Sequence, residues 1–76
     1  MELTVLAFAH ARETCGFSRR TVAFDPSETP RRLLQRLMPE ADPGQWAVAV
    51  DRAYASLDEP LGEARELALI PPVSGG

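Results

Sequence analysis

ELTVLAFA, residues 2–9, decides the fold, because its apolar residues occupy both of the alternating sets of positions in a strand. Leu3 and every second residue after it would face one side, while Leu6 and Phe8 would face the other. Such a pattern predicts a strand that is covered on both faces and central in its sheet. LALI, residues 67–70, is the second strongly apolar stretch, and it ends at two prolines, which cannot donate to a strand ladder. We therefore expect these two strands to lie side by side in the middle of one sheet.

Between these two strands, the sequence predicts one main helix, a short helical segment and three further strands. The predicted segments are one or two helical turns at 10–16, a strand at 19–24 that returns as a hairpin, a helix from 30 to 38, a strand at 46–50, a tight turn at 51–52 and a short return strand at 53–57. The stretches 39–44 and 58–66 are predicted to be loops. One sheet with one covering helix predicts a two-layer α+β domain.

The start and the faces of the main helix are specified by residue type. Thr29 followed by Pro30 is typical of a helix start, since threonine caps free backbone amides and proline has none to cap. The residues that fall on one helical face are Leu33, Leu34, Leu37 and Met38. The residues that lie away from it, which we interpret as solvated helix surface, are Arg31, Arg32 and Arg36.

The size and composition of the chain exclude several classes of protein. At 76 residues it is one small domain. No apolar run reaches the ~20 residues of a membrane helix, and we see no signal peptide, so we expect a cytoplasmic protein with no membrane partner. Cys15 and His10 are the one cysteine and the one histidine, which excludes a disulfide framework and argues against a metal site. We interpret Cys15 as a small buried hydrophobic residue and Trp46 as half core.

The net charge of −3 is unevenly distributed. Residues 1–39 carry six arginines and four acids, or +2, whereas residues 40–76 carry two arginines and seven acids, or −5. The acidic half would repel phosphates, so we do not expect a nucleic acid partner. An electropositive groove of another protein and plain solvation both explain the acidic half. All eight basic residues are arginine, which reflects either codon usage or a surface that offers no amine to a reactive acyl group.

The segment PPVSGG, residues 71–76, has a composition suited to presenting its terminal carboxylate to another protein. Its two prolines favour a stiff, extended chain, and six extended residues reach about 20 Å. Its two glycines have no Cβ, so their backbone fits a channel that is too narrow for other residues. We therefore expect residues 1–70 to form the domain and the remainder to form a flexible tail, which delivers a carboxylate deep into a second protein.

The chemistry open to such a carboxylate is acyl activation. ATP can convert the carboxylate to an acyl-adenylate, whose acyl group then accepts a nucleophile. A sulfur nucleophile gives a thiocarboxylate, and an amine gives an isopeptide link, as in a ubiquitin-like modifier. A plain interaction domain with an inert tail is a further alternative. The chain has neither a nucleophile elbow nor a phosphate-cradling loop, so we expect the catalytic groups to belong to its partners.

Both ends of the chain resemble the small subunit of molybdopterin synthase. LALIPPVSGG at 67–76 is similar to that family's apolar, Pro-Pro-Val, small, Gly-Gly ending. VLAFAHARETCG at 5–16 is similar to its strand and Phe-Ala-x-x-Arg-Glu-x-x-Gly opening. The resemblance implies a ubiquitin-like β-grasp fold, with a mixed sheet of four to five strands covered by one main helix and an extended C-terminal tail. Two turns depart from the family: residues 63–66 replace its Asp-Gly-Asp, and 51–52 lacks its common glycine.

The resemblance also implies a sulfur carrier that is not itself an enzyme and binds no cofactor or metal. An activating enzyme would use ATP to adenylate Gly76, and a sulfurtransferase would supply the sulfur of its thiocarboxylate. The tail would then enter the large, catalytic subunit in a heterotetramer and donate sulfur to cyclic pyranopterin monophosphate, which forms the dithiolene of molybdopterin. Gly75 would permit entry. The residues that would line the insertion channel are Pro71, Pro72, Val73 and Ser74. A carrier for thiazole or another thio-metabolite is an alternative, and Phe8 and Leu61 are either a docking patch for the large subunit or core.

Overall fold

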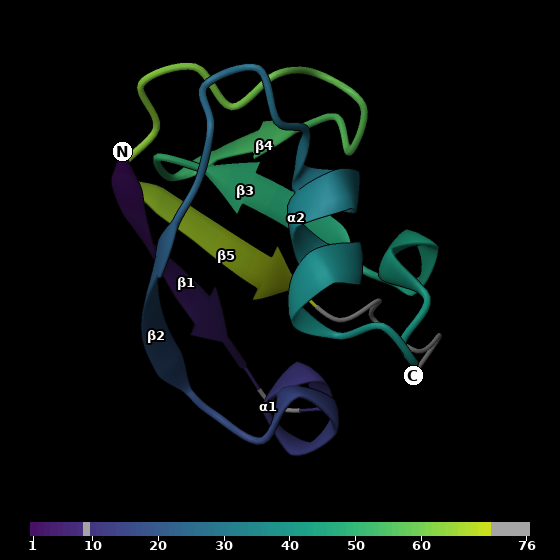
Figure 1. Cartoon of the computed structure of the whole chain (residues 1–76). Coiled ribbons are helices and arrows are strands. Elements are labelled where there is room, and N and C mark those ends of the chain that lie inside the picture. Colours follow the sequence, from purple (N-terminus) through teal and green to yellow (C-terminus); the bar gives the residue numbers. More distant parts are fainter. Residues whose placement is uncertain (9, 71–76) are drawn as a thin grey trace.

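A computed structural model describes residues 1–8 and 10–70, in which five strands form one sheet and one main helix packs against it (Figure 1). The elements are, in order, β1 (Glu2–Ala7), α1 (His10–Cys15), β2 (Arg19–Ala23), α2 (Pro30–Leu37), the 3-10 turn η1 (Pro43–Gln45), β3 (Ala47–Val50), β4 (Ala53–Ala55) and β5 (Glu66–Ile70). This arrangement of one sheet and one main helix confirms the predicted α+β class.

The strand order of the sheet is β2-β1-β5-β3-β4. β1 and β5 are parallel neighbours, whereas every other pair of adjacent strands is antiparallel. The prediction that the two most apolar strands lie side by side in the middle of the sheet is therefore confirmed. It also follows that β5, the last strand in the sequence, is hydrogen-bonded on both sides.

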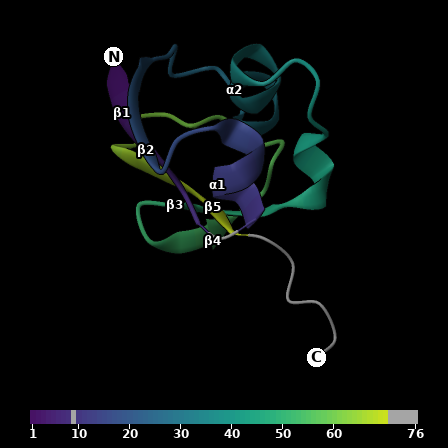
Figure 2. The same ribbon diagram turned by 90° about the horizontal axis from the view of Figure 1, so that it is seen from below.

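α2 lies across one face of the sheet, and the core fills the space between them (Figure 2). Leu33 and Leu34 of α2 are fully buried. The sheet side chains that share their cluster are Leu3, Val5, Ala7, Val22, Val48, Leu67 and Leu69. Trp46 and Leu61 belong to the same cluster at 5% and 6% exposure. The interpretation of Trp46 as half core is therefore wrong, and Leu61 is a core residue.

The predicted start of the main helix is confirmed. Thr29 is the N-cap of α2, its hydroxyl oxygen accepts a hydrogen bond of 3.2 Å from the backbone nitrogen of Arg32, and Pro30 takes the first helical position. α2 ends at Leu37, and Met38 caps it by donating its backbone N–H to the carbonyl of Leu34. In the part of the chain that the structure describes, no helix is long and apolar enough to cross a membrane.

The prediction that the first strand is covered on both faces is wrong. The core-facing residues of β1 are buried, but Leu6 on its other face is only half-buried, and Phe8 just beyond the strand is 51% exposed. The reason is that α2 covers only one face of the sheet. We call the opposite surface the outer face.

The stretch 39–44 was predicted to be loop, yet the single turn η1 begins within it. Asp42 caps it, because one carboxylate oxygen accepts a hydrogen bond of 2.9 Å from the backbone nitrogen of Gly44, and Pro43 follows in the first position. Three residues are too few to show a helical periodicity in the sequence. Only the Asp-Pro pair could have indicated this turn.

Candidate functional site

The root of the predicted tail is the end of β5. All the predicted site residues, from Pro71 to Gly76, lie outside the described residues, so what the structure gives is the strand from which they continue. β5 is anchored by Leu67 and Leu69, both fully buried, and Ile70 is paired with Ala47 of β3. The tail therefore continues from the middle of the sheet, where the root is held by both neighbouring strands and by the core.

The outer face carries a row of apolar side chains beside this root. Leu6 is opposite Ala68, Ala68 is opposite Ala49, and Ala49 is opposite Tyr54. Paired residues point to the same face of a sheet, so these four residues cross the outer face from β1 to β4. Tyr54 is 79% exposed at one end of the row. An apolar surface of this kind is suited to contact with another protein.

A hollow of about 350 Å³ opens on the outer face next to Leu6, and we call it the arginine hollow. Its lining residues are Thr4, Leu6, Arg19, Arg52, Arg65 and Glu66. Arg19 is opposite Leu6, and Glu66 is opposite Thr4. The Nε atom of Arg52 lies 3.9 Å from a carboxylate oxygen of Glu66. Three arginines and a single carboxylate thus line this hollow.

The turn between β3 and β4 holds one side of the arginine hollow. Asp51 and Arg52 both have positive φ, at 49° and 71°. One carboxylate oxygen of Asp51 accepts hydrogen bonds from the backbone nitrogens of Arg65 and Glu66, at 2.9 and 3.0 Å. The backbone nitrogen of Asp51 also donates to the carbonyl of Glu66, at 3.0 Å. The predicted tight turn is therefore present, and it is fastened to the first residues of β5.

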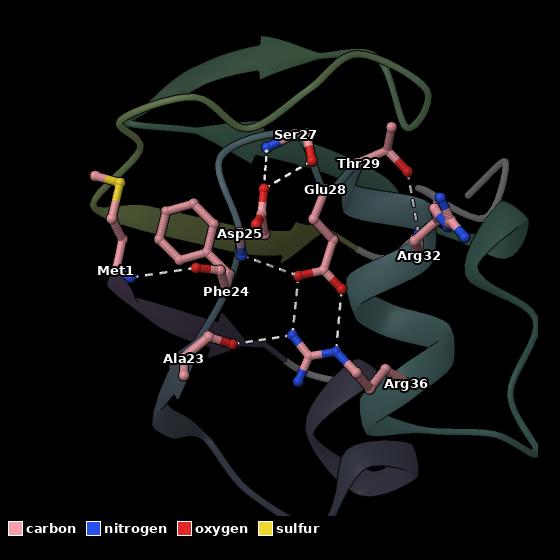
Figure 3. Close-up of polar contacts among 9 residues, drawn as sticks. All are labelled: Met1, Ala23, Phe24, Asp25, Ser27, Glu28, Thr29, Arg32 and Arg36. Atoms are coloured by element: carbon pink, nitrogen blue, oxygen red, sulfur yellow. Dashed lines mark hydrogen bonds and ion pairs between the residues drawn. The ribbon is translucent and has the colours of Figure 1, made fainter.

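A second polar cluster ties β2 to α2 (Figure 3). Arg36 binds both carboxylate oxygens of Glu28, at 2.9 and 3.0 Å, and donates to the carbonyl of Ala23 at 2.9 Å. The hydrogen bonds from Arg36 lower the pKa of Glu28 and favour its charged form. Arg31 is likewise hydrogen-bonded to both oxygens of Asp58. The interpretation of these arginines as solvated helix surface is confirmed for Arg32 and Arg36, which are exposed, whereas Arg31 is half-buried.

Cys15 lies in a depression of about 530 Å³ beside the end of α2. It is half-buried against the core, and its thiol donates to the sulfur of Met38 at 2.9 Å. Burial raises the pKa of the Cys15 thiol, so the thiol is protonated at neutral pH and is a poor nucleophile. Within residues 1–8 and 10–70, no cluster of three metal-binding side chains is present. Cys15 therefore contributes a thiol of low reactivity at this depression.

Sequence reasoning missed the arginine hollow. Arg19 could be placed on one parity of its strand, but Arg52 and Arg65 stand in a turn and at the foot of a strand, far from it in sequence. Only the sheet order and the fastening of the turn by Asp51 bring the three together. The missing glycine at 51–52 was the one available signal that this turn is unusual.

Comparison with known proteins identifies what the chain resembles. A family model described as the ThiS family matches residues 5–76. The molybdopterin synthase sulfur carrier subunit of Escherichia coli (strain K12) is 35% identical, over 97% of this chain and 99% of that protein.

Two solved structures resemble the fold. The crystal structure of small archaeal modifier protein 1 from Haloferax volcanii has a TM-score of 0.74 and 26% identity, and the match covers 95% of this chain and 98% of that one. Subunit 1 of molybdopterin-converting factor from Helicobacter pylori, solved in complex with subunit 2, has a TM-score of 0.62 and 23% identity, and the match covers both chains completely. With the strand order described above, these likenesses confirm the ubiquitin-like β-grasp fold.

Proposed function

This chain belongs to the ThiS family, and from that premise we propose that it is the sulfur carrier subunit of a molybdopterin synthase. The observation that carries the proposal is the near full-length identity to the Escherichia coli sulfur carrier subunit, combined with a Gly-Gly tail that continues from an anchored central strand. The sulfur is carried on the terminal carboxylate, so the carrier itself needs no catalytic group.

The proposed chemistry takes place at Gly76 in two steps. First, the carboxylate attacks the α-phosphate of ATP in the activating enzyme, pyrophosphate leaves, and an acyl-adenylate forms. Second, a sulfur nucleophile supplied by a sulfurtransferase attacks the acyl carbon and AMP leaves, so that sulfur replaces one oxygen. The thiocarboxylate sulfur then forms a bond to cyclic pyranopterin monophosphate in the large subunit, and water hydrolyses the resulting thioester, so that the sulfur stays on the substrate and Gly76 returns to a carboxylate. Two such transfers complete one dithiolene.

The fold serves this chemistry by fixing where the tail begins. β5 is paired on both sides, and its Leu67 and Leu69 are fully buried. The end of β5 is therefore held in a fixed position relative to the rest of the domain. A fixed root reduces the conformational entropy that is lost when the tail enters a channel. In the sequence that follows, two prolines favour an extended chain and Gly75 has no Cβ, which would suit entry into a narrow channel.

We propose that the large, catalytic subunit receives the tail and binds the outer face of the sheet. The Helicobacter pylori protein of the same fold was solved with its subunit 2, which supports a partner of this kind. On this chain the apolar row from Leu6 to Tyr54 is the surface that adjoins the root of the tail. Such a partner would bury it.

A second candidate function is conjugation to other proteins, because the Haloferax volcanii relative is named a modifier. In that case the activated Gly76 would meet a lysine amine of a target instead of sulfur. A sulfur carrier for thiazole or another thio-metabolite uses the same chemistry in a different pathway. Identity to a molybdopterin synthase subunit favours the first candidate over both.

Intact mass spectrometry of the chain, incubated with ATP, a sulfide source and the activating enzyme of its host, tests the proposal. We expect a mass gain equal to one oxygen-for-sulfur exchange, mapped to Gly76, and no gain in a variant that lacks Gly75 and Gly76. Addition of the large subunit and cyclic pyranopterin monophosphate should then return the mass to its original value. Absence of any gain, with an enzyme that is active on another carrier, would contradict the proposal. A ladder of covalent adducts in host extracts would favour the modifier.

A further inference from the structure

The arginine hollow has a local charge opposite to that of the whole chain. The chain carries −3, yet the lining of the hollow contains Arg19, Arg52 and Arg65 against the single acid Glu66. Glu66 is 3.9 Å from Arg52, and in the described part of the chain neither of the other two guanidinium groups has an ion pair. Uncompensated guanidinium groups that converge on one hollow attract anions.

The arginines elsewhere in the chain show the contrast. Arg31 and Arg36 each bind both oxygens of one carboxylate, with Asp58 and Glu28 as their partners. This two-pronged geometry is the preferred way for arginine to meet a carboxylate. The fold thus satisfies two of the three arginines of α2 internally, whereas Arg19 and Arg65 of the hollow stay available to another molecule.

The turn between β3 and β4 fixes where the side chain of Arg52 lies. Val50 is paired with Ala53, so the hairpin loop has two residues, and such a loop requires positive φ at both of them, as at Asp51 and Arg52. The carboxylate of Asp51 fastens this turn to the start of β5. The side chain of Arg52 is 91% exposed beside Glu66, where another molecule can reach it.

We propose that the arginine hollow docks a carboxylate-bearing strip of the large catalytic subunit, next to an apolar patch that covers Leu6 and Ala68. This inference rests on the proposed function. It concerns a protein carboxylate and not a nucleic acid, because a chain with a net charge of −3 repels an extended polyanion, whereas a single carboxylate feels mainly charges within about 10 Å. The sequence-based idea was that the acidic half, residues 40–76, faces a basic groove, whereas the hollow is a basic site that takes Arg52 and Arg65 from that same half.

The position of the hollow explains how a contact there would affect the tail. Glu66 begins β5 and Ile70 ends it, so docking at the hollow fixes the strand about 13 Å from the root of the tail. The apolar row lies between the hollow and that root on the same face. Carboxylates placed against the hollow would therefore set the orientation of the domain, and with it the direction in which the tail leaves.

The test measures the affinity of this chain for its large subunit at several salt concentrations. The variant is Arg19→Gln with Arg65→Gln, and the matched control, with the same change in net charge, is Arg20→Gln with Arg32→Gln. We expect the hollow variant to bind about tenfold more weakly at low salt and to lose most of the salt dependence of the wild type. The control should bind within twofold of the wild type.

Arg52→Gly separates binding from folding, because glycine relieves the positive φ while it removes the guanidinium. We expect the melting temperature to rise by about 2–6 °C and the affinity for the large subunit to fall severalfold. A variant that was merely misfolded would instead show a lower melting temperature together with a lower affinity. Equal or higher affinity of Arg52→Gly, with unchanged salt dependence, would overturn the proposal.

Each remaining outcome is decisive. If the wild type binds the large subunit but the hollow variant binds equally well, the hollow proposal fails and the sulfur carrier proposal stands. If the wild type takes up sulfur at Gly76 but does not bind the large subunit, the hollow proposal and the synthase assignment fail together. If the hollow variant loses affinity only for single-stranded DNA, or loses only self-association in gel filtration, the occupant is a polyanion or a second copy and the proposal is overturned.

Discussion

Val5 of β1 and Leu67 of β5 are direct partners across the parallel junction of the sheet, and neither side chain is exposed to solvent (0%). The pair joins the beginning of the chain to the strand that precedes the tail. Its side chains lie in the core beneath α2. The position of the tail root therefore depends on the hydrophobic core.

Leu67→Ala is expected to destabilise the domain by about 3 kcal/mol, because it leaves a cavity beneath α2. This is a large share of the roughly 5–10 kcal/mol that stabilise a small domain. Urea denaturation monitored through Trp46 measures it. Leu6→Ala is the control, since that half-buried side chain on the outer face should cost only about 1 kcal/mol. Equal losses for the two variants would contradict the assignment of core and outer face.

The Glu28–Arg36 pair is expected to make stability depend on pH. The pKa of Glu28 is lowered in the folded state, mainly by the hydrogen bonds from Arg36. The stabilisation is therefore present above the unfolded pKa of 4.5 and is lost as pH falls through the lower, folded value. Because the pair is partly exposed, we expect a contribution of about 1 kcal/mol.

Glu28→Gln isolates this contribution in thermal melts between pH 7 and pH 3. The difference in stability between wild type and variant should be constant at neutral pH and should shrink below about pH 4.5. Asp25 and Asp58 also have lowered pKa values, through hydrogen bonds from Ser27 and Arg31, so both proteins will lose some stability in acid. A difference that does not change with pH would rule out the charged pair as its source.

Cys15 is expected to react slowly with thiol reagents in the folded protein. Burial raises the pKa of its thiol and the thiol contacts the sulfur of Met38, so little thiolate is present at pH 7.5. Labelling with iodoacetamide, followed by mass spectrometry, should be at least tenfold slower than in the same protein in urea. A folded rate equal to the unfolded one would show an open, reactive thiol instead.

Removal of Gly75 and Gly76 is expected to abolish sulfur uptake and leave the fold intact. The core cluster and the sheet end at Ile70, so the melting temperature should change by less than about 1 °C. Gly75→Leu is a finer variant: it keeps the carboxylate of Gly76 but widens the tip. We expect Gly75→Leu to slow adenylation strongly, and normal sulfur uptake by this variant would contradict a narrow channel.

The sequence was sufficient for the parts of the fold that depend on local patterns. Periodicity indicated α2, the Thr29–Pro30 pair indicated its start, and the apolar character of β1 and β5 placed them side by side. The outer face was predicted wrongly, because an apolar residue such as Leu6 is equally compatible with burial under a helix and with a surface that a partner covers. The β-grasp fold itself was indicated only by resemblance to a family.

One part of the candidate site could likewise be predicted from the sequence, and another part could not. The tail was visible in the sequence because its chemistry resides in consecutive residues. The arginine hollow was not, because it depends on the register between β1 and β2 and on Asp51 holding a turn against β5. Such a site is a property of the sheet topology, which no local pattern encodes.

The place of β5 in the sheet also bears on how the protein is made. The strand that completes the sheet is the last to be synthesised, and its parallel partner β1 is the first, so the nascent chain holds only two separate hairpins until residues 66–70 emerge. Closing the sheet then requires a contact across almost the whole chain, which makes folding a late event. A chain terminated before β5 would lack the central strand, and its sheet would stay open. The strand that closes the sheet is thus also the strand from which the tail continues.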